Sequence, residues 1–147
     1  MLQRLFRLSG LWAIALAIGC VQAATPIPIP KDIAGIWTTP DSEFRGQTLV
    51  KGRALYLDVD GSGASIAGDG QNTMGAKLVA KAYNPDTHTF SFDLLESRNV
   101  IMGTTMVYDP VKKILFSPND PREKYERRFD EVSPETRKAL GLDARMK

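Results

Sequence analysis

Apolar and polar residues alternate with a period of two along most of this chain. Leu55, Leu57 and Val59 occupy alternate positions, for example, and Tyr56 and Asp58 lie between them. This alternation is typical of a β-strand that turns one face toward a core and the other toward solvent. The pattern therefore predicts a protein built mainly from half-buried strands.

Short segments of this kind recur between groups of Gly, Pro, Asn and Asp. The predicted strands are Ile33–Thr39, Gln47–Val50, Arg53–Val59, Gly75–Tyr83, Phe90–Leu94, Val100–Tyr108, Ile114–Phe116 and Lys124–Asp130. We expect Leu78, Ala80 and Ala82 to share the core face of their strand. Residues 60–72 are rich in Gly and small polar residues, so they predict a loop that contains at most a weak strand at 64–67.

A short unit of Tyr, then Asn or Asp, then Pro occurs twice in the middle of the chain. It lies at residues 83–85 and again 25 positions later, at 108–110. The Asn or Asp side chain and the Pro that follows it favour a turn, and an apolar run comes after each unit. The repeat predicts two strand–turn–strand units and therefore an antiparallel meander.

Many short strands with regular turn signals and little helix predict an all-β fold. We expect the meander to close into a small barrel of about eight strands, because closure removes exposed strand edges. Ser133 as N-cap and Pro134 in the first turn predict a short helix that Gly141 ends. The expected segments are a signal peptide at 1–23, a Pro-rich lead-in at 24–32, a barrel domain at 33–132, and a short helix with a polar tail at 133–147.

Gly35-Ile36-Trp37 on the first predicted strand, with Arg127 and Arg128 on the last one, resembles the calycin pattern of lipocalins and avidins. In those families the Gly-x-Trp tryptophan closes one end of the barrel, and an arginine from the last strand packs over it. The resemblance implies structural roles for Gly35, Trp37 and one of the two arginines. It leaves the ligand open, because neither the second lipocalin motif nor the biotin-contacting residues of avidins occur here. The alternative is that Trp37 is a core aromatic of another β fold.

The first 23 residues have the pattern of a signal peptide. Arg4 and Arg7 precede the apolar stretch Leu11–Val21, which is shorter than the roughly 20 apolar residues that span a bilayer. Cleavage after Ala23 predicts a periplasmic or secreted protein. The alternative is a lipid anchor in the cell envelope, because the residues before Cys20 resemble a bacterial lipoprotein box; membrane association is expected only in that case.

Proline alternates with apolar residues at 25–30. Such a run favours polyproline II. It could serve as a spacer between a lipidated Cys20 and the domain. We favour an extended lead-in to the first strand, because chain termini are usually of that kind.

The charge of the chain gives no reason to expect a nucleic-acid partner. The first 23 residues hold two of the 19 basic residues and none of the 17 acidic ones, so the remainder is balanced. Cys20 is the one cysteine, and its removal would leave no thiol for a disulfide, a nucleophile or a metal. No nucleophile elbow, phosphate loop, zinc helix or dinucleotide fingerprint occurs. We therefore expect a protein that is not an enzyme.

An acidic segment resembles the start of an EF-hand calcium loop. Asp58, Asp60, Ser62 and Asp69 fall at the first, third, fifth and twelfth loop positions, and Gly63 falls at the sixth. However, the expected apolar residue is displaced by one position, and a strand, not a helix, precedes the segment. We expect no cofactor and a hairpin tip here, with calcium as the alternative.

His88 and two acidic residues are the other groups that could carry chemistry. His88 is the only histidine, and we expect a solvated turn residue because no second metal ligand accompanies it. Asp93 and Glu96 could form a carboxylate pair. We expect them to be exposed charges on the outer face, as acidic residues usually are.

Trp37, Phe90, Phe92, Met102 and Met106 are the candidate ligand-binding residues. Methionine adapts to irregular apolar ligands, although it also fills cores, and a barrel of this size encloses at most one small ligand. The main hypothesis is an exported, non-enzymatic barrel that binds a small apolar ligand or an envelope protein. The alternatives are an inhibitor or immunity-type protein that blocks an enzyme cleft with its 60–72 loop, and a hydrolase that uses the carboxylate pair.

Overall fold

The computed structural model describes residues 25–142, and strands dominate this range. Its nine strands and one helix are β1 (Gly35–Thr38), β2 (Glu43–Arg45), β3 (Thr48–Leu57), β4 (Ser62–Asp69), β5 (Thr73–Asn84), β6 (Thr89–Glu96), β7 (Asn99–Asp109), β8 (Ile114–Phe116), β9 (Lys124–Phe129) and α1 (Pro134–Ala139). The predicted all-β class and the short C-terminal helix are confirmed. The predicted signal peptide, Cys20 and the end of the polar tail lie outside the described residues.

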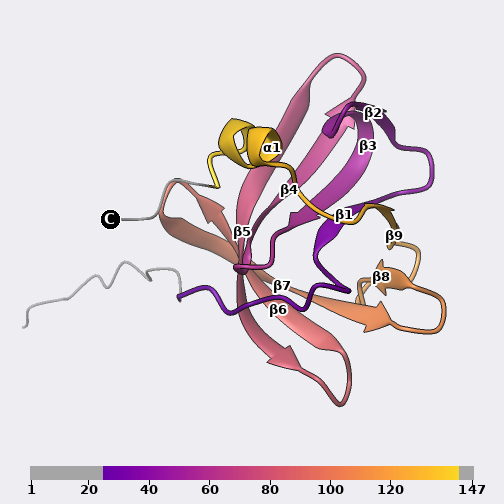
Figure 1. The fold of residues 1–147 in the computed structure, drawn as a ribbon, viewed down its shortest axis with the longest axis vertical. Coiled ribbons are helices and arrows are strands. Elements are labelled where there is room, and N and C mark those ends of the chain that lie inside the picture. Colours follow the sequence, from indigo (N-terminus) through magenta and orange to yellow (C-terminus); the bar gives the residue numbers. More distant parts are fainter. Residues whose placement is uncertain (1–24, 143–147) are drawn as a thin grey trace, which may run out of the picture.

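Eight of the strands close into an antiparallel barrel in the order β1, β3, β4, β5, β6, β7, β8, β9 and back to β1 (Figure 1). The second half of β3, Ala54–Leu57, pairs with β1. Its first half, Thr48–Lys51, pairs with the outer strand β2, which has no counterpart among the predicted strands. The closed meander is confirmed, and it is consistent with a calycin-like barrel.

The two repeated units form matching turns. The side chain of Asn84 accepts hydrogen bonds from the backbone N–H groups two and three residues later, and Asp109 does the same in the second unit. His88 and Lys113 occupy equivalent places and both have positive φ, at 51° and 55°. The repeat in the sequence is therefore a repeat of turn geometry.

The prediction of a loop at 60–72 is wrong, because β4 fills most of that segment. β4 pairs along its length with β3 on one side and β5 on the other. Its small residues are needed for close approach: a Cβ on Gly63 would lie 2.2 Å from the carbonyl oxygen of Tyr56. The inhibitor alternative therefore lacks the long loop on which it depended.

Two further strand predictions need correction. β3 continues through Gly52, where two separate strands were expected, because φ of +96° there bends the chain without ending the pairing. In β5, a register shift between Ala80 and Ala82 exposes Ala82 and turns Tyr83 toward the core. A bulge of this kind reverses the alternation of faces, so the expectation for Ala82 is wrong.

The barrel wall has apolar clusters on both of its faces. Inside lies the main core, which includes Trp37, Leu57, Phe90 and Tyr125. The outer cluster lies against β1, β3 and β4, and its members are Ile36, Leu49, Ala54, Tyr56, Ala64 and Val132, with Phe44, Ile66, Phe129 and Leu140 packed against them. This part of the wall is thus covered on both sides.

Residues 25–34, the lead-in segment, pack across one end of the barrel. The amide of Ile27 donates to the carbonyl of Ala80 at 2.9 Å, and that of Ile29 donates to Val59 at 3.0 Å. Ile29 and Ile33 are buried. The described part of the Pro-rich run is therefore bound to the barrel and does not extend away from it as a spacer.

Arg127 of β9 holds the lead-in segment, β1 and β9 together at this end. Its guanidinium lies 5.9 Å from the ring centroid of Trp37 and donates to the carbonyls of Lys31, Ala34 and Asp130. The indole N–H of Trp37 donates to the Ile33 carbonyl at 2.7 Å. We call this arrangement the Arg127–Trp37 stack.

Gly35 allows the Arg127–Trp37 stack to form. It has φ of +130°, and a Cβ there would lie 2.3 Å from the carbonyl oxygen of Phe129. The first glycine of Gly-x-Trp is therefore required both by backbone conformation and by the close approach of β9.

We predict that Gly35→Ala lowers the free energy of unfolding by about 2–4 kcal/mol, because the new Cβ combines strain with a backbone clash. Urea denaturation followed by tryptophan fluorescence measures the change. Gly103→Ala is the control, since a Cβ there would meet only the Phe92 carbonyl oxygen, at 3.8 Å. Equal losses in the two variants would contradict this account of Gly35.

Candidate functional site

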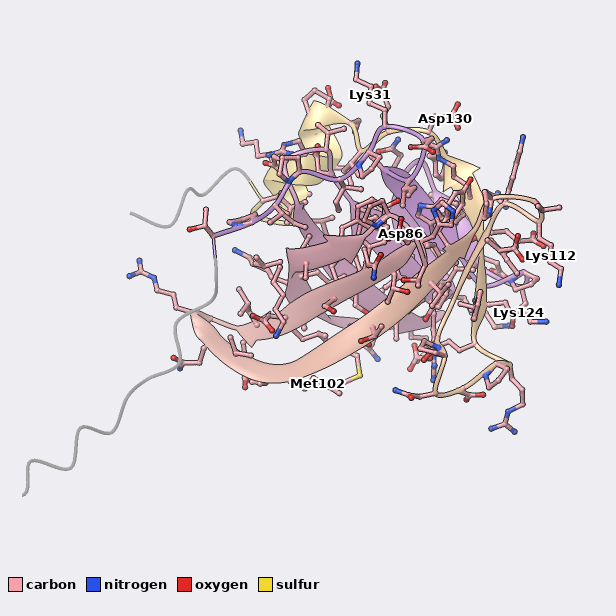
Figure 2. The ribbon with its side chains drawn as sticks, turned by 90° about the horizontal axis from the view of Figure 1, so that it is seen from below. Lys31, Asp86, Met102, Lys112, Lys124 and Asp130 are labelled. Atoms are coloured by element: carbon pink, nitrogen blue, oxygen red, sulfur yellow. The ribbon has the colours of Figure 1, made fainter. Side chains whose placement is uncertain are left out.

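The barrel interior holds a cavity of about 150 Å³. Its apolar lining comes from β3, β5, β6 and β7, and consists of Leu55, Leu57, Leu78, Phe92, Leu94, Met102 and Met106. Figure 2 shows Met102 on the opposite side of the molecule from Lys31 and Asp130, two residues that bind Arg127. The cavity therefore lies away from the end that the Arg127–Trp37 stack closes.

Met102 marks the entrance to the cavity. Its side chain lines the cavity and is still 55% exposed, whereas Met106, four residues further along the same face of β7, is 5% exposed. A long, flexible thioether at the entrance can move aside for an apolar group. The cavity is thus accessible from the Met102 side.

Polar groups also line the cavity. Tyr125 donates a hydrogen bond to Glu123, and Arg53 lies 3.6 Å from the same carboxylate. Burial and then the bond to Glu123 raise the pKa of the Tyr125 phenol. The phenol therefore keeps its proton at neutral pH and acts as a donor. The site combines an apolar floor with a polar rim, the usual composition of a small-molecule pocket.

A shallow groove of about 590 Å³ adjoins the cavity and shares Glu123 with it. Its lining includes Asp41, Arg53, Asp120 and Arg122. Arg122 and Asp120 pair with each other at 3.1 Å, so this surface offers charges of both signs. The polar part of a ligand whose apolar end fills the cavity would face this groove.

The structure divides the predicted ligand-binding residues into two groups. Phe92, Met102 and Met106 line the cavity. Trp37 and Phe90 instead fill the closed half of the core, where Trp37 packs edge-on against Tyr108 and Phe90 stacks on Tyr83 at 4.2 Å.

The sequence did not identify Glu123 and Arg53 as site residues. Of the polar groups at the cavity, only Tyr125 could be recognised from the sequence, because it alternates with charged neighbours. Tyr125 lies at a position of β9 that the period-two pattern turns inward. Glu123 precedes β9 and meets Arg53 of β3 only because the barrel closes. No local pattern could reveal that contact.

Three of the four predicted calcium ligands lie close together, and Asp69 lies apart from them. Asp58 and Asp60 lie at the turn between β3 and β4, and both pair with Arg137 of α1. Ser62 bonds to Asp60. Asp69 lies at the other end of β4 from Ser62, which corresponds to about 23 Å at the rise of an extended strand. Its carboxylate accepts hydrogen bonds from backbone amides of its own turn. Among residues 25–142, no three His, Cys, Asp or Glu side chains gather as metal ligands.

The other candidate chemical groups are also apart. The Nδ1 atom of His88 lies 3.5 Å from the hydroxyl of Tyr83, in the turn where it was expected. Asp93 is 7% exposed and pairs with Lys81 at 3.2 Å, so the expectation of a solvated charge is wrong for this residue. Glu96 is exposed at the end of β6, as expected. Its position, three residues from Asp93 on a strand, places it on the opposite face.

Arg128, the second arginine named with Trp37, lies elsewhere. Its guanidinium is 5.6 Å from the ring centroid of Phe44 of β2. Arg128 therefore contributes to the outer cluster, and Arg127 alone packs over Trp37.

Comparisons with known proteins give no relative for this chain. No protein-family model matches it, and neither a curated protein nor a solved structure does so. Within residues 25–142, no helix has the length and apolar character needed to cross a membrane.

The pairing of Arg137 with the turn between β3 and β4 predicts a pH dependence of stability. Partial burial acts to raise the pKa of Asp60, but hydrogen bonds from Ser62 and the Arg137 guanidinium outweigh it and hold the pKa below its ordinary value. A lowered pKa stabilises the fold above the unfolded value of about 3.9, and this contribution is lost as the pH falls toward the folded value.

We expect the free energy of unfolding to fall less between about pH 5 and pH 2 in Asp60→Asn than in the unaltered protein. The difference should be below about 1 kcal/mol, because half of the Asp60 side chain is exposed to solvent. Urea denaturation across this pH range measures it. Asp69→Asn, at the other end of β4, distinguishes the loss of the Arg137 pair from the loss of any turn carboxylate. An identical pH profile for Asp60→Asn and the unaltered protein would contradict the role of the pair.

Proposed function

We propose that this protein is an exported, non-enzymatic β-barrel that binds a small apolar ligand, or an apolar group of a larger partner, in the cavity beneath Met102. The observation that carries the proposal is the cavity of about 150 Å³ with an apolar floor and an accessible entrance. Apolar cavities of this size in other proteins take up benzene. A single aromatic ring or a short branched alkyl group therefore matches the space.

Export is part of the proposal and rests on the sequence of residues 1–23. The protein would act in the periplasm or outside the cell, or on the envelope surface if Cys20 carries a lipid. The resemblance to lipocalins and avidins also belongs here. The Arg127–Trp37 stack supports it, because the pattern places an arginine of the last strand over the tryptophan of Gly-x-Trp.

The proposal contains no chemical step. Glu123 is the carboxylate at the cavity, and it already accepts from Tyr125 and pairs with Arg53. Because its pKa is raised, the phenol of Tyr125 stays protonated at neutral pH, so it has no free phenolate to act as a base. These groups are suited to fix the orientation of a bound molecule.

Titration with benzene tests the cavity directly. In protein labelled with ¹³C at the methionine methyl groups, benzene should shift the signals of Met102 and Met106 in a saturable manner. The signal of Met74 should not move, because that side chain is 76% exposed on β5 and does not line the cavity.

Thr104→Leu and Thr105→Leu form a matched pair for this titration. Thr104 lines the cavity, so the larger side chain should fill part of it and weaken benzene binding by at least about tenfold. Thr105 lies on the other face of β7, so its replacement should change binding by less than about twofold. Absent or non-saturable shifts at Met102 and Met106, or equal effects of the two variants, would contradict the proposed function.

A further inference from the structure

One edge of β7 has no strand beside it over half of its length. β7 pairs with β6 from Asn99 to Val107, but it pairs with β8 only from Val107 to Asp109. β8 ends at Phe116, and Pro118, which lacks an N–H, follows one residue later. Within residues 25–142, no other strand continues this pairing. The barrel wall is therefore open beside residues 101–105.

The pairing of β7 with β6 determines which backbone groups of β7 point into the opening. The amide of Tyr108 donates to the carbonyl of His88, in the direction of β6. Because successive amides of a strand point to alternate sides, the amides of Thr104 and Met106 also point to β6. The N–H and C=O groups of Gly103 and Thr105 therefore point into the opening.

The side chains at the opening do not protect it. Natural sheets blunt free edges with charges, prolines, bulges or short strands. A bulge occurs at Ile101, at one end of the opening, whereas residues 102–105 pair regularly with β6. Residues 100–105 contain no charged residue and no proline, and Ile101 and Met102 are 53% and 55% exposed. An uncharged, apolar free edge of this kind is a surface to which another strand can add.

Gly103 lies at the centre of this edge, and neither its backbone conformation nor its neighbours require a glycine there. Every other described glycine has either a positive φ or a Cβ position within 2.6 Å of a neighbouring atom, whereas Gly103 has neither. A glycine inside a strand costs stability, and it often marks a place where another backbone approaches closely.

The cavity lies directly behind the opening. Met102, Thr104 and Met106 of β7 line it. Tyr125 of β9, which pairs with Leu115 of β8, and Glu123, which precedes β9, also line it. Residues directly opposite one another in paired strands point to the same face. A strand added along β7 would therefore direct the side chains opposite Met102 and Thr104 into the cavity.

We propose that this site recognises an extended, uncharged peptide segment, which adds as a strand along the free edge of β7 and inserts one aromatic or branched apolar side chain into the cavity. Backbone pairing with Gly103 and Thr105 supplies the hydrogen bonds, and the cavity supplies the selection among side chains, as in other cases of strand addition. This inference rests on the proposed function, because the same cavity receives the apolar group.

The charge and length of the edge argue against two other occupants. The C-terminal residues 143–147 carry three charges in five positions, which neither the uncharged edge nor the apolar cavity matches. A second copy would meet only a stretch of about 17 Å. Stable interfaces need about 1,200 Å² or more, which so short an edge supplies only with help from other surfaces.

Synthetic peptides test the proposal with the purified protein. The probe is an acetylated and amidated hexapeptide of sequence Thr-Val-Thr-Phe-Thr-Val, with a fluorophore on a flexible linker, and binding is measured by fluorescence anisotropy. We expect saturable binding that weakens at least about tenfold when alanine replaces the phenylalanine, because the cavity is then left empty.

N-methylated forms of the same peptide test the backbone pairing. In a strand added antiparallel to β7 with the phenylalanine turned inward, the amides of its two threonine neighbours face β7, and its own amide faces away. Methylation of the two threonine amides should therefore reduce affinity at least about tenfold, and methylation of the phenylalanine amide should reduce it much less.

Gly103→Pro and Gly103→Ala provide the matched change in the protein. Proline removes the donor that points into the opening and leaves the bonds to β6, so peptide binding should fall at least about tenfold. Alanine keeps the donor, so its Cβ should weaken binding much less than proline does. If Gly103→Pro does not fold, the N-methylated peptides still decide the question with the unaltered protein.

Three results would overturn the proposal. They are equal affinity for the phenylalanine and alanine peptides, equal effects of the two patterns of N-methylation, and a dimer of the free protein that Gly103→Pro converts to a monomer. Benzene shifts at Met102 and Met106 without peptide binding would overturn only this proposal and leave the proposed function standing. Loss of both would remove the proposed function as well.

Discussion

The stack of Arg127 on Trp37 is the contact on which the rest of this structure depends. One guanidinium binds carbonyls of the lead-in segment and of the residue that follows β9, while its face covers the indole of Trp37 in β1. Since these segments are more than 90 residues apart in sequence, the contact can form only when the barrel has closed. It fills one end of the interior and leaves the remaining free space at the other end, beneath Met102.

In the described part of the chain, the barrel wall is covered by an outer layer at β3 and β4 and is uncovered at β7. β3 and β4 are covered outside by β2 and by Val132 and Leu140, which flank α1, and Arg137 fixes the helix to the turn between the two strands. Within residues 25–142, no outer cluster of this kind lies against β7, and its neighbour on one side, β8, is only three residues long. The packed wall thus carries an open seam along β7, and the cavity lies behind that seam. This arrangement suits a binding site, because a rigid scaffold positions a small region that can accept a partner.

The fold could be predicted from the sequence to the extent that its signals are local. The period-two alternation and the repeated Asn84 and Asp109 turns gave the meander, and Gly35 with Trp37 indicated how one end closes. The strand β4 could not be recognised, because its Gly and Ala residues respond to close neighbours that the sequence does not reveal. Bulges such as that at Ala80–Ala82 are equally hidden, since one extra residue reverses the faces without changing the composition. The site was predicted only in part, because Glu123 and Arg53 meet through closure of the barrel.

Amide hydrogen exchange of the free protein, resolved by NMR, tests most directly the claim that the barrel is closed at the Arg127–Trp37 end and open along β7. The account predicts slow exchange in β1 and in the paired amides of Thr104 and Met106. The amides of Gly103 and Thr105, in the same strand, should exchange at least about tenfold faster. Equal protection of all four amides of β7 would show that a neighbour already covers this edge, and it would contradict the central claim.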